Sequence, residues 1–205
     1  TVECYGRLDV AVNNAAVTPD TRLLSEMDES QFDRVIAVDL KGVALCLKYQ
    51  LSQMIRQGQG GSIVNIGSVT GFMPMPFMAL YSATKHALAA YSDALDHELR
   101  DVGIRISVIE PAFMKTSIDA NSQASDAPMT EYHEVRRAMD TRVKEMLADA
   151  EDPIVVAEAV LNAARSAHPK RRYAAGTAAR RLRWIHAFLP AQLLDTGLRK
   201  QLRLG

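Results

Sequence analysis

The sequence contains little cysteine. Only Cys4 and Cys46 occur among its 205 residues, and their spacing matches no metal-binding motif. The five histidines likewise form no H-E-x-x-H or related pattern, so we expect no metal site. A disulfide-stabilised secreted scaffold is excluded, and a reduced, cytoplasmic protein is the expectation.

Long hydrophobic runs are also missing. No uninterrupted apolar stretch approaches the ~18 residues that a membrane-spanning helix needs. With 48% hydrophobic and 23% charged residues, the composition is that of one globular domain with a sizeable core.

Acidic residues are scarce only near the C-terminus. From Ala167 onward there are nine Lys or Arg and one acid, Asp195, so this part carries +8 and the rest −8. The favoured explanation is a solvated face or a lid or partner contact, and we expect no nucleic acid as a partner. One alternative is contact with an anionic membrane, because three leucines recur every four residues beside basic ones. The leucines are Leu194, Leu198 and Leu202, and the basic residues are Arg199, Lys200 and Arg203.

Three short β-type runs are present, and helical patterns separate them. The runs are Leu8–Ala15, Ser62–Ser68 and Ile104–Pro111. This alternation predicts an α/β fold in which a parallel sheet is joined by crossover helices. The first helical region is predicted from about Ser30 to Gln57, where the glycine-rich segment "QGQGG" ends it.

The second helical pattern places core-facing residues at steps of three and four, and Gly103 fits its C-terminal end. These residues are Leu80, Thr84, Leu88, Tyr91, Leu95 and Leu99. Beyond Pro111 the sequence predicts a polar loop, followed by two helices, a short strand and two amphipathic helices. In chain order these elements are Thr116–Met129, Glu131–Ala148, Pro153–Ala167, Arg171–Gly176 and the helical pair within Thr177–Leu204.

The stretch "YSATK" places Tyr81 and Lys85 four residues apart on the second helix. At this spacing both side chains lie on one helix face, one turn apart. An ammonium group beside a phenol favours the phenolate, so the pair is a plausible acid/base device.

Ser68 is the last residue of the second β-type run, thirteen residues before Tyr81. In open α/β sheets ligands bind beyond the carboxyl ends of the strands, where Ser68 and Tyr81 can meet one substrate oxygen. Alternatively, Ser68 only caps or turns the chain. A hydrolase nucleophile is disfavoured because "GSVTG" places the serine directly after the glycine, unlike G-x-S-x-G.

Four segments together carry a family resemblance. In order and spacing, "GRLDVAVNNAA" (Gly6–Ala16), "GSIVNIGS" (Gly61–Ser68), "YSATK" and "PAFMKT" (Pro111–Thr116) resemble the short-chain dehydrogenase/reductase family. The C-terminal "HPKRRYAAG" (His168–Gly176) is loosely similar to members that act on steroid-like or retinoid-like alcohols.

The resemblance implies an oxidoreductase that uses NAD or NADP. Tyr81 would be the general acid in ketone reduction and the base in alcohol oxidation. Lys85 would lower the pKa of the tyrosine and bind the nicotinamide ribose, and Ser68 would orient the substrate oxygen. Asp39 occupies the position of an asparagine that assists the lysine.

The resemblance also implies where the cofactor lies. Asn14, Ala15 and Ala16 would line it on one side, and the segment that begins at Pro111 would line it on the other. In that segment, Thr116 and the backbone near Met114 would hold the nicotinamide amide.

The sequence departs from the family pattern in several places. Ala16 and Ala112 stand where the family usually has glycine, and each adds a methyl group near the cofactor. No G-x-x-x-G-x-G phosphate loop occurs anywhere.

We therefore expect an N-terminally truncated, Rossmann-like doubly wound parallel sheet that lacks the first βαβαβ segment. It would form one partial domain, with residues 1–116 as the cofactor and catalytic part and 117–205 as the substrate loop and C-terminal helices.

The segment "GFMPMPFMAL" (Gly71–Leu80) is rich in Met and Phe, which favours a substrate-pocket lining over core packing. A small apolar alcohol or carbonyl substrate follows from it. Two other hypotheses stay open: a sugar-nucleotide epimerase or dehydratase, and a non-catalytic remnant or interaction module. The resemblance further implies a homodimer or homotetramer that pairs through the two long helices.

Overall fold

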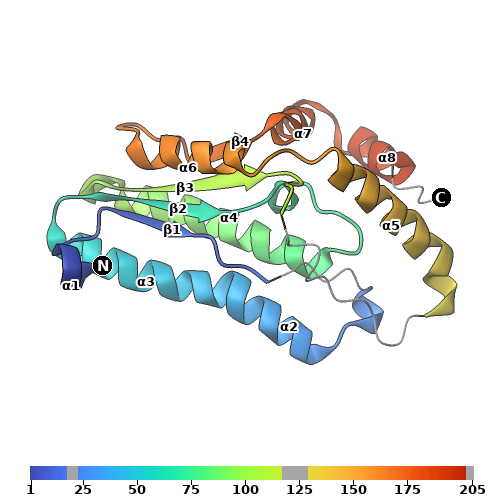
Figure 1. Cartoon of the computed structure of the whole chain (residues 1–205), viewed down its shortest axis with the longest axis horizontal. Helices are drawn as coiled ribbons and strands as arrows, with labels where there is room; N and C mark the ends of the chain where they lie inside the picture. Colours follow the sequence, from blue (N-terminus) through green and yellow to red (C-terminus); the bar gives the residue numbers. More distant parts are fainter. Residues whose placement is uncertain (18–22, 117–128, 202–205) are drawn as a thin grey trace.

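A four-stranded parallel sheet forms the centre of the molecule (Figure 1). In the computed structural model, residues 1–17, 23–116 and 129–201 are described. The strands lie in the order β1 (Val10–Asn13), β2 (Gly61–Ile66), β3 (Ile104–Pro111) and β4 (Arg172–Ala175). The predicted parallel α/β sheet is confirmed, and all four predicted strands are present.

Helices cover both faces of this sheet, as Figure 1 shows. The helices α3 (Val43–Gln57) and α4 (Ala79–Leu99) pack on one face, and α6 (Ile154–Arg165) packs on the other. Because side chains alternate along a strand, Ile63 is buried under α3 and α4, whereas its neighbour Val64 is buried under α6. Both faces being buried explains the apolar residues of β2 and β3, among which Asn65, Ser107 and Glu110 are buried polar residues.

The first long helical region is interrupted by a π-helical segment. Asp28 caps α2 (Glu29–Val35) by accepting from the Ser30 amide at 2.9 Å, and Gly58 ends α3 in the left-handed conformation. Between α2 and α3, residues Ile36–Gly42 form the π-helix. The helix predicted over Ser30–Gln57 is confirmed in extent, but its π segment was not predicted.

Helix α4 follows the predicted core stripe with one exception. Leu80, Leu88 and Leu99 are buried as expected, but Tyr91 is 44% exposed. The buried residue in that turn is Ser92, whose hydroxyl donates to the Leu88 carbonyl at 2.7 Å. A short 3₁₀ turn, Arg100–Val102, continues the helix, and left-handed Gly103 ends it as predicted.

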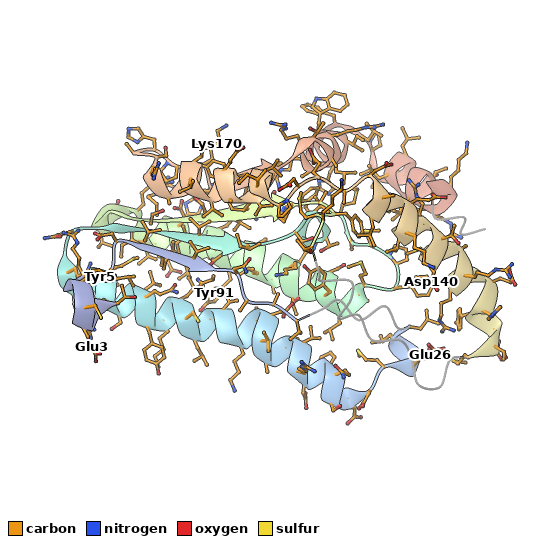
Figure 2. All side chains as sticks on the ribbon, in the orientation of Figure 1. Glu3, Tyr5, Glu26, Tyr91, Asp140 and Lys170 are labelled. Atoms are coloured by element: carbon orange, nitrogen blue, oxygen red, sulfur yellow. The ribbon has the colours of Figure 1, made fainter. Side chains whose placement is uncertain are left out.

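The C-terminal part forms helices around strand β4. They are η6 (Thr130–Tyr132), α5 (His133–Ala148), α6, α7 (Thr177–Phe188) and α8 (Ala191–Gln201), which match the predicted segments. Two short helices precede α2 in the chain, namely α1 (Val2–Tyr5) and η1 (Leu24–Glu26). Arg136 of α5 pairs with Glu26 at 2.6 Å, so α5 is tied to the segment after β1 (Figure 2).

Two predicted features of the C-terminal part, the polar loop and the leucine row, lie partly outside the described residues. Most of the loop predicted over Thr116–Met129 falls on 117–128, outside the described residues, as do Leu202 and Arg203. In α8, Leu194 and Leu198 are half-buried, and Leu193 is the exposed leucine. Because Leu202 lies outside the described residues, contact of this leucine row with a membrane stays a prediction. Within the described residues, none of the helices is long and apolar enough to span a bilayer.

Candidate active site

Ser68 lies two residues beyond the end of strand β2 and caps a single 3₁₀ turn, η3 (Val69–Gly71). Its hydroxyl accepts hydrogen bonds from the Thr70 amide at 3.1 Å and from the Thr70 hydroxyl at 3.0 Å. Ser68 therefore caps this turn. Because a hydroxyl has one donor and two acceptor positions, these two bonds leave its own proton as a donor, and the Tyr81 side chain is within hydrogen-bonding reach of it.

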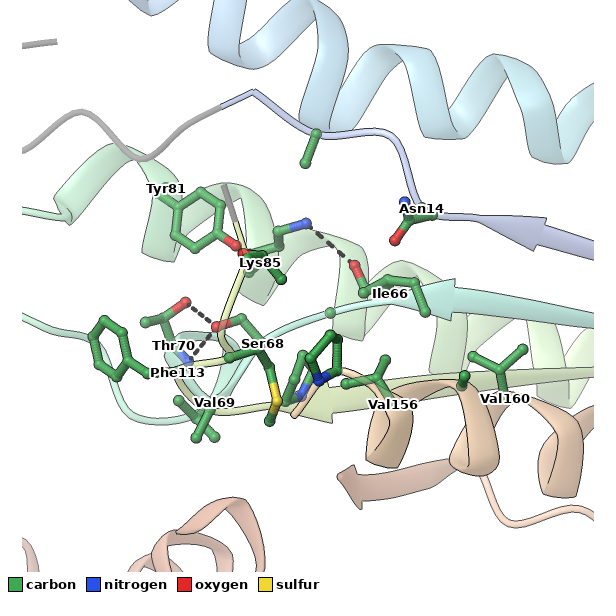
Figure 3. Close-up of a pocket in the computed structure, with 18 of the residues that line it drawn as sticks. Asn14, Ile66, Ser68, Val69, Thr70, Tyr81, Lys85, Phe113, Val156 and Val160 are labelled. Atoms are coloured by element: carbon green, nitrogen blue, oxygen red, sulfur yellow. Dashed lines mark hydrogen bonds between the residues drawn. The ribbon is translucent and has the colours of Figure 1, made fainter. Parts of the chain in front are cut away.

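Tyr81 and Lys85 project from the first two turns of α4, toward the end of β2 (Figure 3). Both side chains are buried, and the Lys85 Nζ atom lies 5.3 Å from the centroid of the tyrosine ring. Nζ also donates to the Ile66 carbonyl at 3.2 Å. The lysine is therefore held between the tyrosine and the strand that leads to Ser68.

A close approach of η3 to α4 brings Ser68 and Tyr81 together. A Cβ atom on Gly71 would lie 3.0 Å from the carbonyl oxygen of Lys85, so only glycine fits there without displacement. The turn that Ser68 begins can consequently pack directly on the helix that carries Tyr81 and Lys85.

Asp39 lies in the π-helical segment and is completely buried. Its Oδ1 atom accepts from the Val17 amide at 2.8 Å. The other oxygen, Oδ2, has no hydrogen-bond partner among the described residues. A π segment is a frequent feature of functional sites, and here it places an unpaired carboxylate oxygen near the lysine and the tyrosine.

The three ionisable groups influence one another. Burial raises the pKa of Tyr81, and the negative charge of Asp39 raises it further, while a hydrogen bond with the Ser68 side chain lowers it. Burial lowers the pKa of Lys85, and Asp39 acts in the opposite direction. Burial raises the pKa of Asp39, whereas the hydrogen bond from the Val17 amide and the positive charge of Lys85 lower it.

The pKa of Tyr81 therefore shifts opposite to the direction expected from Lys85 alone. The physical reason is that desolvation disfavours the phenolate more than the neighbouring groups favour it. At neutral pH Tyr81 is protonated, which suits it to donate a proton.

This coupling gives a testable pH dependence. Replacing Asp39 with Asn removes the negative charge that raises the pKa of Tyr81, so that pKa should fall. We expect the Asp39→Asn variant to oxidise alcohols faster at neutral pH, with the acidic limb of its kcat/KM profile, on which a general base titrates, shifted to lower pH. Asp33→Asn, on the exposed side of α2, is the matched control. An unchanged profile for Asp39→Asn would show that the carboxylate does not couple to the pair.

These residues open into a cavity of about 620 Å³. Most of the predicted site residues line it, namely Asn14, Ala16, Ser68, Tyr81, Lys85, Pro111, Met114 and Thr116. Ala15 and Asp39 do not line the cavity. Ala15 is exposed to solvent. Asp39 lies behind the tyrosine–lysine pair and reaches the site only through its charge.

Comparison with known proteins agrees with this geometry. The profile of the short chain dehydrogenase family matches residues 1–127. The chain belongs to this family. A short chain dehydrogenase/reductase of Aspergillus oryzae, astE, is 40% identical over 138 residues, which cover 67% of this chain and 52% of that protein.

Solved short-chain dehydrogenases share the fold over most of this chain. One from Streptomyces avermitilis superposes with a TM-score of 0.76 at 26% identity, covering 99% of this chain and 71% of that one. The structure of a tyrosine-to-phenylalanine variant of ElxO with NADPH bound gives a TM-score of 0.67 at 26% identity, covering 84% of this chain and 66% of that one. The chain spans about half to three fifths of the length of its curated relatives.

The two alanines that depart from the family pattern have different surroundings. Ala16 is exposed at the rim of the cavity, whereas Ala112 is partly buried and packs against Val69 and Phe72. The methyl group of Ala112 therefore contributes to packing as well as to the cavity wall.

In this short-chain dehydrogenase, the sequence predicted only some of the apolar residues that line the cavity. Met75 and Met78 line the cavity as proposed, but Phe72 and Met73 pack into a core cluster under α7. A further wall comes from α5 and α6, which the sequence pattern did not indicate. Its residues are Leu147, Pro153, Val156, Ala157, Val160 and Leu161.

Proposed function

We propose that the protein interconverts an alcohol and a ketone or aldehyde on an apolar substrate, using NAD or NADP. The observation that carries this proposal is the convergence of the Ser68, Tyr81 and Lys85 side chains at one end of an apolar cavity. Family membership supports the reaction class, and ElxO with NADPH bound supports the cofactor class.

In this proposal Ser68 and Tyr81 bind the same substrate oxygen. Ser68 donates its hydroxyl proton to that oxygen in a hydrogen bond and orients it. Tyr81 gives its phenolic proton to the carbonyl oxygen during reduction, or takes the hydroxyl proton during oxidation. The Lys85 ammonium stabilises the phenolate that reduction leaves behind.

The described residues fit the nicotinamide half of the cofactor. Lys85 has three donor hydrogens, and the Ile66 carbonyl is the acceptor that it contacts, so donors remain for ribose hydroxyls. Asn14 and Ala16 would hold one side of this group, and Pro111, Met114 and Thr116 the other. When bound, the nicotinamide supplies or accepts the hydride.

The substrate class follows from the cavity wall. Beyond the polar end, the lining side chains are mainly aliphatic, methionine or phenylalanine, which favour apolar ligands through area removed from water. We expect a medium-chain methyl ketone or an aromatic ketone to be reduced with a higher kcat/KM than acetoin. Cofactor absorbance reports the rate. Equal kcat/KM for the apolar ketones and acetoin would contradict the substrate class.

The same assay separates the competing hypotheses. A sugar-nucleotide epimerase or dehydratase would show turnover of a nucleotide sugar without net cofactor oxidation, and its ligand would require a polar wall that this cavity does not provide. A non-catalytic remnant would show no turnover of any ketone or alcohol, although it could still bind NADH or NADPH.

We further propose that α3 and α4 pair two copies of the chain. Tyr49 on α3 is 67% exposed and Tyr91 on α4 is 44% exposed, which is unusual for aromatic residues of long helices. We expect at least a dimer by sedimentation velocity, weakened by Tyr49→Glu. Tyr5→Glu, at an exposed tyrosine of α1, should change nothing. A wild-type monomer at micromolar concentration would refute the pairing.

A further inference from the structure

Helix α7 packs against the back of the candidate active site. Ala179 of α7 is completely buried against Val69 and Phe72, and Ala112 packs against the same cluster. Val69 follows Ser68 in the chain, and Ala112 follows the last residue of β3. The helix therefore contacts both segments that supply side chains to the cavity.

One arginine of α7 binds both segments at once. The guanidinium of Arg183 donates to the Glu110 carboxylate at 2.7 Å. The same group lies over the ring of Phe72, 5.1 Å from its centroid. Glu110 is 1% exposed and directly precedes Pro111. A planar guanidinium suits this double contact, because it can stack on a ring while its edge binds a carboxylate.

Phe72 is the residue that ends the turn begun by Ser68. Its amide donates to the Val69 carbonyl at 3.1 Å, and the Gly71 amide donates to the Ser68 carbonyl at 3.0 Å. The Phe72 ring also meets His186 of α7 edge-on, with 5.3 Å between the ring centroids. The position of this ring thus fixes the turn on which the Ser68 hydroxyl lies.

The buried Glu110 carboxylate does not depend on Arg183 alone. Arg172 of β4 donates to its other oxygen at 2.7 Å and also pairs with Asp93 of α4 at 2.5 Å. If Arg183 is removed, Glu110 still keeps a charged partner. Loss of Arg183 should therefore release Phe72 and its turn without unfolding the sheet.

We propose that Arg183 is a positioning residue, which holds the Ser68 turn at a fixed distance from the strand end at Pro111. This inference rests on the proposed oxidoreductase function, because it assigns Arg183 to the orientation of the substrate oxygen. Arg183 itself does not line the cavity. It acts through Phe72 on Ser68 and through Glu110 on Pro111.

The test is a double-substitution cycle with Ser68→Ala. In the wild-type background, Arg183→Gln should lower kcat about 10- to 100-fold, the scale of a misplaced catalytic group, with little change in cofactor affinity. In the Ser68→Ala background the same substitution should lower kcat less than about twofold, since the residue that it positions is already gone. Arg183→Lys should give an intermediate kcat, because lysine keeps the charge pair with Glu110 but loses the stacked plane.

A second measurement does not depend on turnover. Arg183→Gln should accelerate hydrogen exchange of the Gly71 and Phe72 amides, while Arg181→Gln on the exposed side of α7 should not. Where Arg183→Gln unfolds, Phe72→Leu removes the ring from Arg183 and His186, leaves the Arg183–Glu110 pair, and should show the same two effects.

The outcomes distinguish this inference from the proposed function. An equal loss of kcat in both backgrounds, or unchanged exchange at Gly71 and Phe72, would overturn the role of Arg183. A wild-type protein without turnover would instead contradict the proposed function, and the exchange measurement would still decide whether Arg183 fixes the turn.

Discussion

Replacement of Tyr81 with Phe should lower kcat about 10²- to 10⁴-fold, the range that general acid–base catalysis supplies. The phenol is the group in the cavity that can exchange a proton with the substrate oxygen, and phenylalanine cannot replace it. The ring itself is kept, so the packing of α4 and the contact between the ring and Lys85 should persist. Steady-state rates with an apolar ketone measure the effect.

Cofactor binding should respond differently to this substitution. Lys85 and Asn14 remain in place, so the Kd for NADH or NADPH, measured by fluorescence titration, should stay within about threefold of wild type, an effect below about 1 kcal/mol. Tyr91→Phe is the matched control, since it removes an exposed hydroxyl from the same helix. Wild-type turnover in Tyr81→Phe would contradict the role of Tyr81 as the general acid or base. A loss of cofactor affinity would show that the phenol mainly binds the cofactor.

Much of the fold could be predicted because its residues carry periodic signals. Strands β2 and β3 carry isoleucine and valine on both buried faces, and α4 repeats its leucines at helical spacing. The π segment at Ile36–Gly42 carries no such signal, because one added residue in a helical turn leaves composition and spacing almost unchanged. The prediction for Tyr91 was wrong for a related reason, since a tyrosine suits a core stripe as well as an exposed face.

The sequence also predicted part of the candidate site. Ser68, Tyr81 and Lys85 converge because the carboxyl end of β2 and the start of α4 meet at one edge of the sheet. The wall from α5 and α6 and the pair Arg183–Glu110 were not predicted. The two residues of that pair are 73 positions apart, and only the packing of α7 on β4 and on the turn after β2 brings them together.

Stability should depend on a charged residue in the second half of α4. Asp96 is completely buried, and its carboxylate accepts from Arg100 at 2.6 Å, from Arg105 at 2.9 Å and from the Ile106 amide at 3.1 Å. It therefore ties the helix that carries Tyr81 and Lys85 to strand β3. Burial raises the pKa of Asp96, but the two arginines and the Ile106 amide outweigh it, so the net pKa is lowered.

Asp96→Ala should lower the free energy of unfolding by about 3–5 kcal/mol, because it leaves a buried amide unsatisfied and a partly buried arginine unpaired. This is a large share of the roughly 5–15 kcal/mol that stabilises a typical domain.

Since the pKa of Asp96 is lowered by folding, its ionic stabilisation is present above the ordinary value of 3.8 and is lost as the pH falls below it. The advantage of wild type over Asp96→Asn should consequently narrow below about pH 4. Urea unfolding at neutral and acidic pH measures both effects, with Asp101→Ala on the surface as the control. A loss under about 1 kcal/mol for Asp96→Ala would mean that the network adds little to the fold.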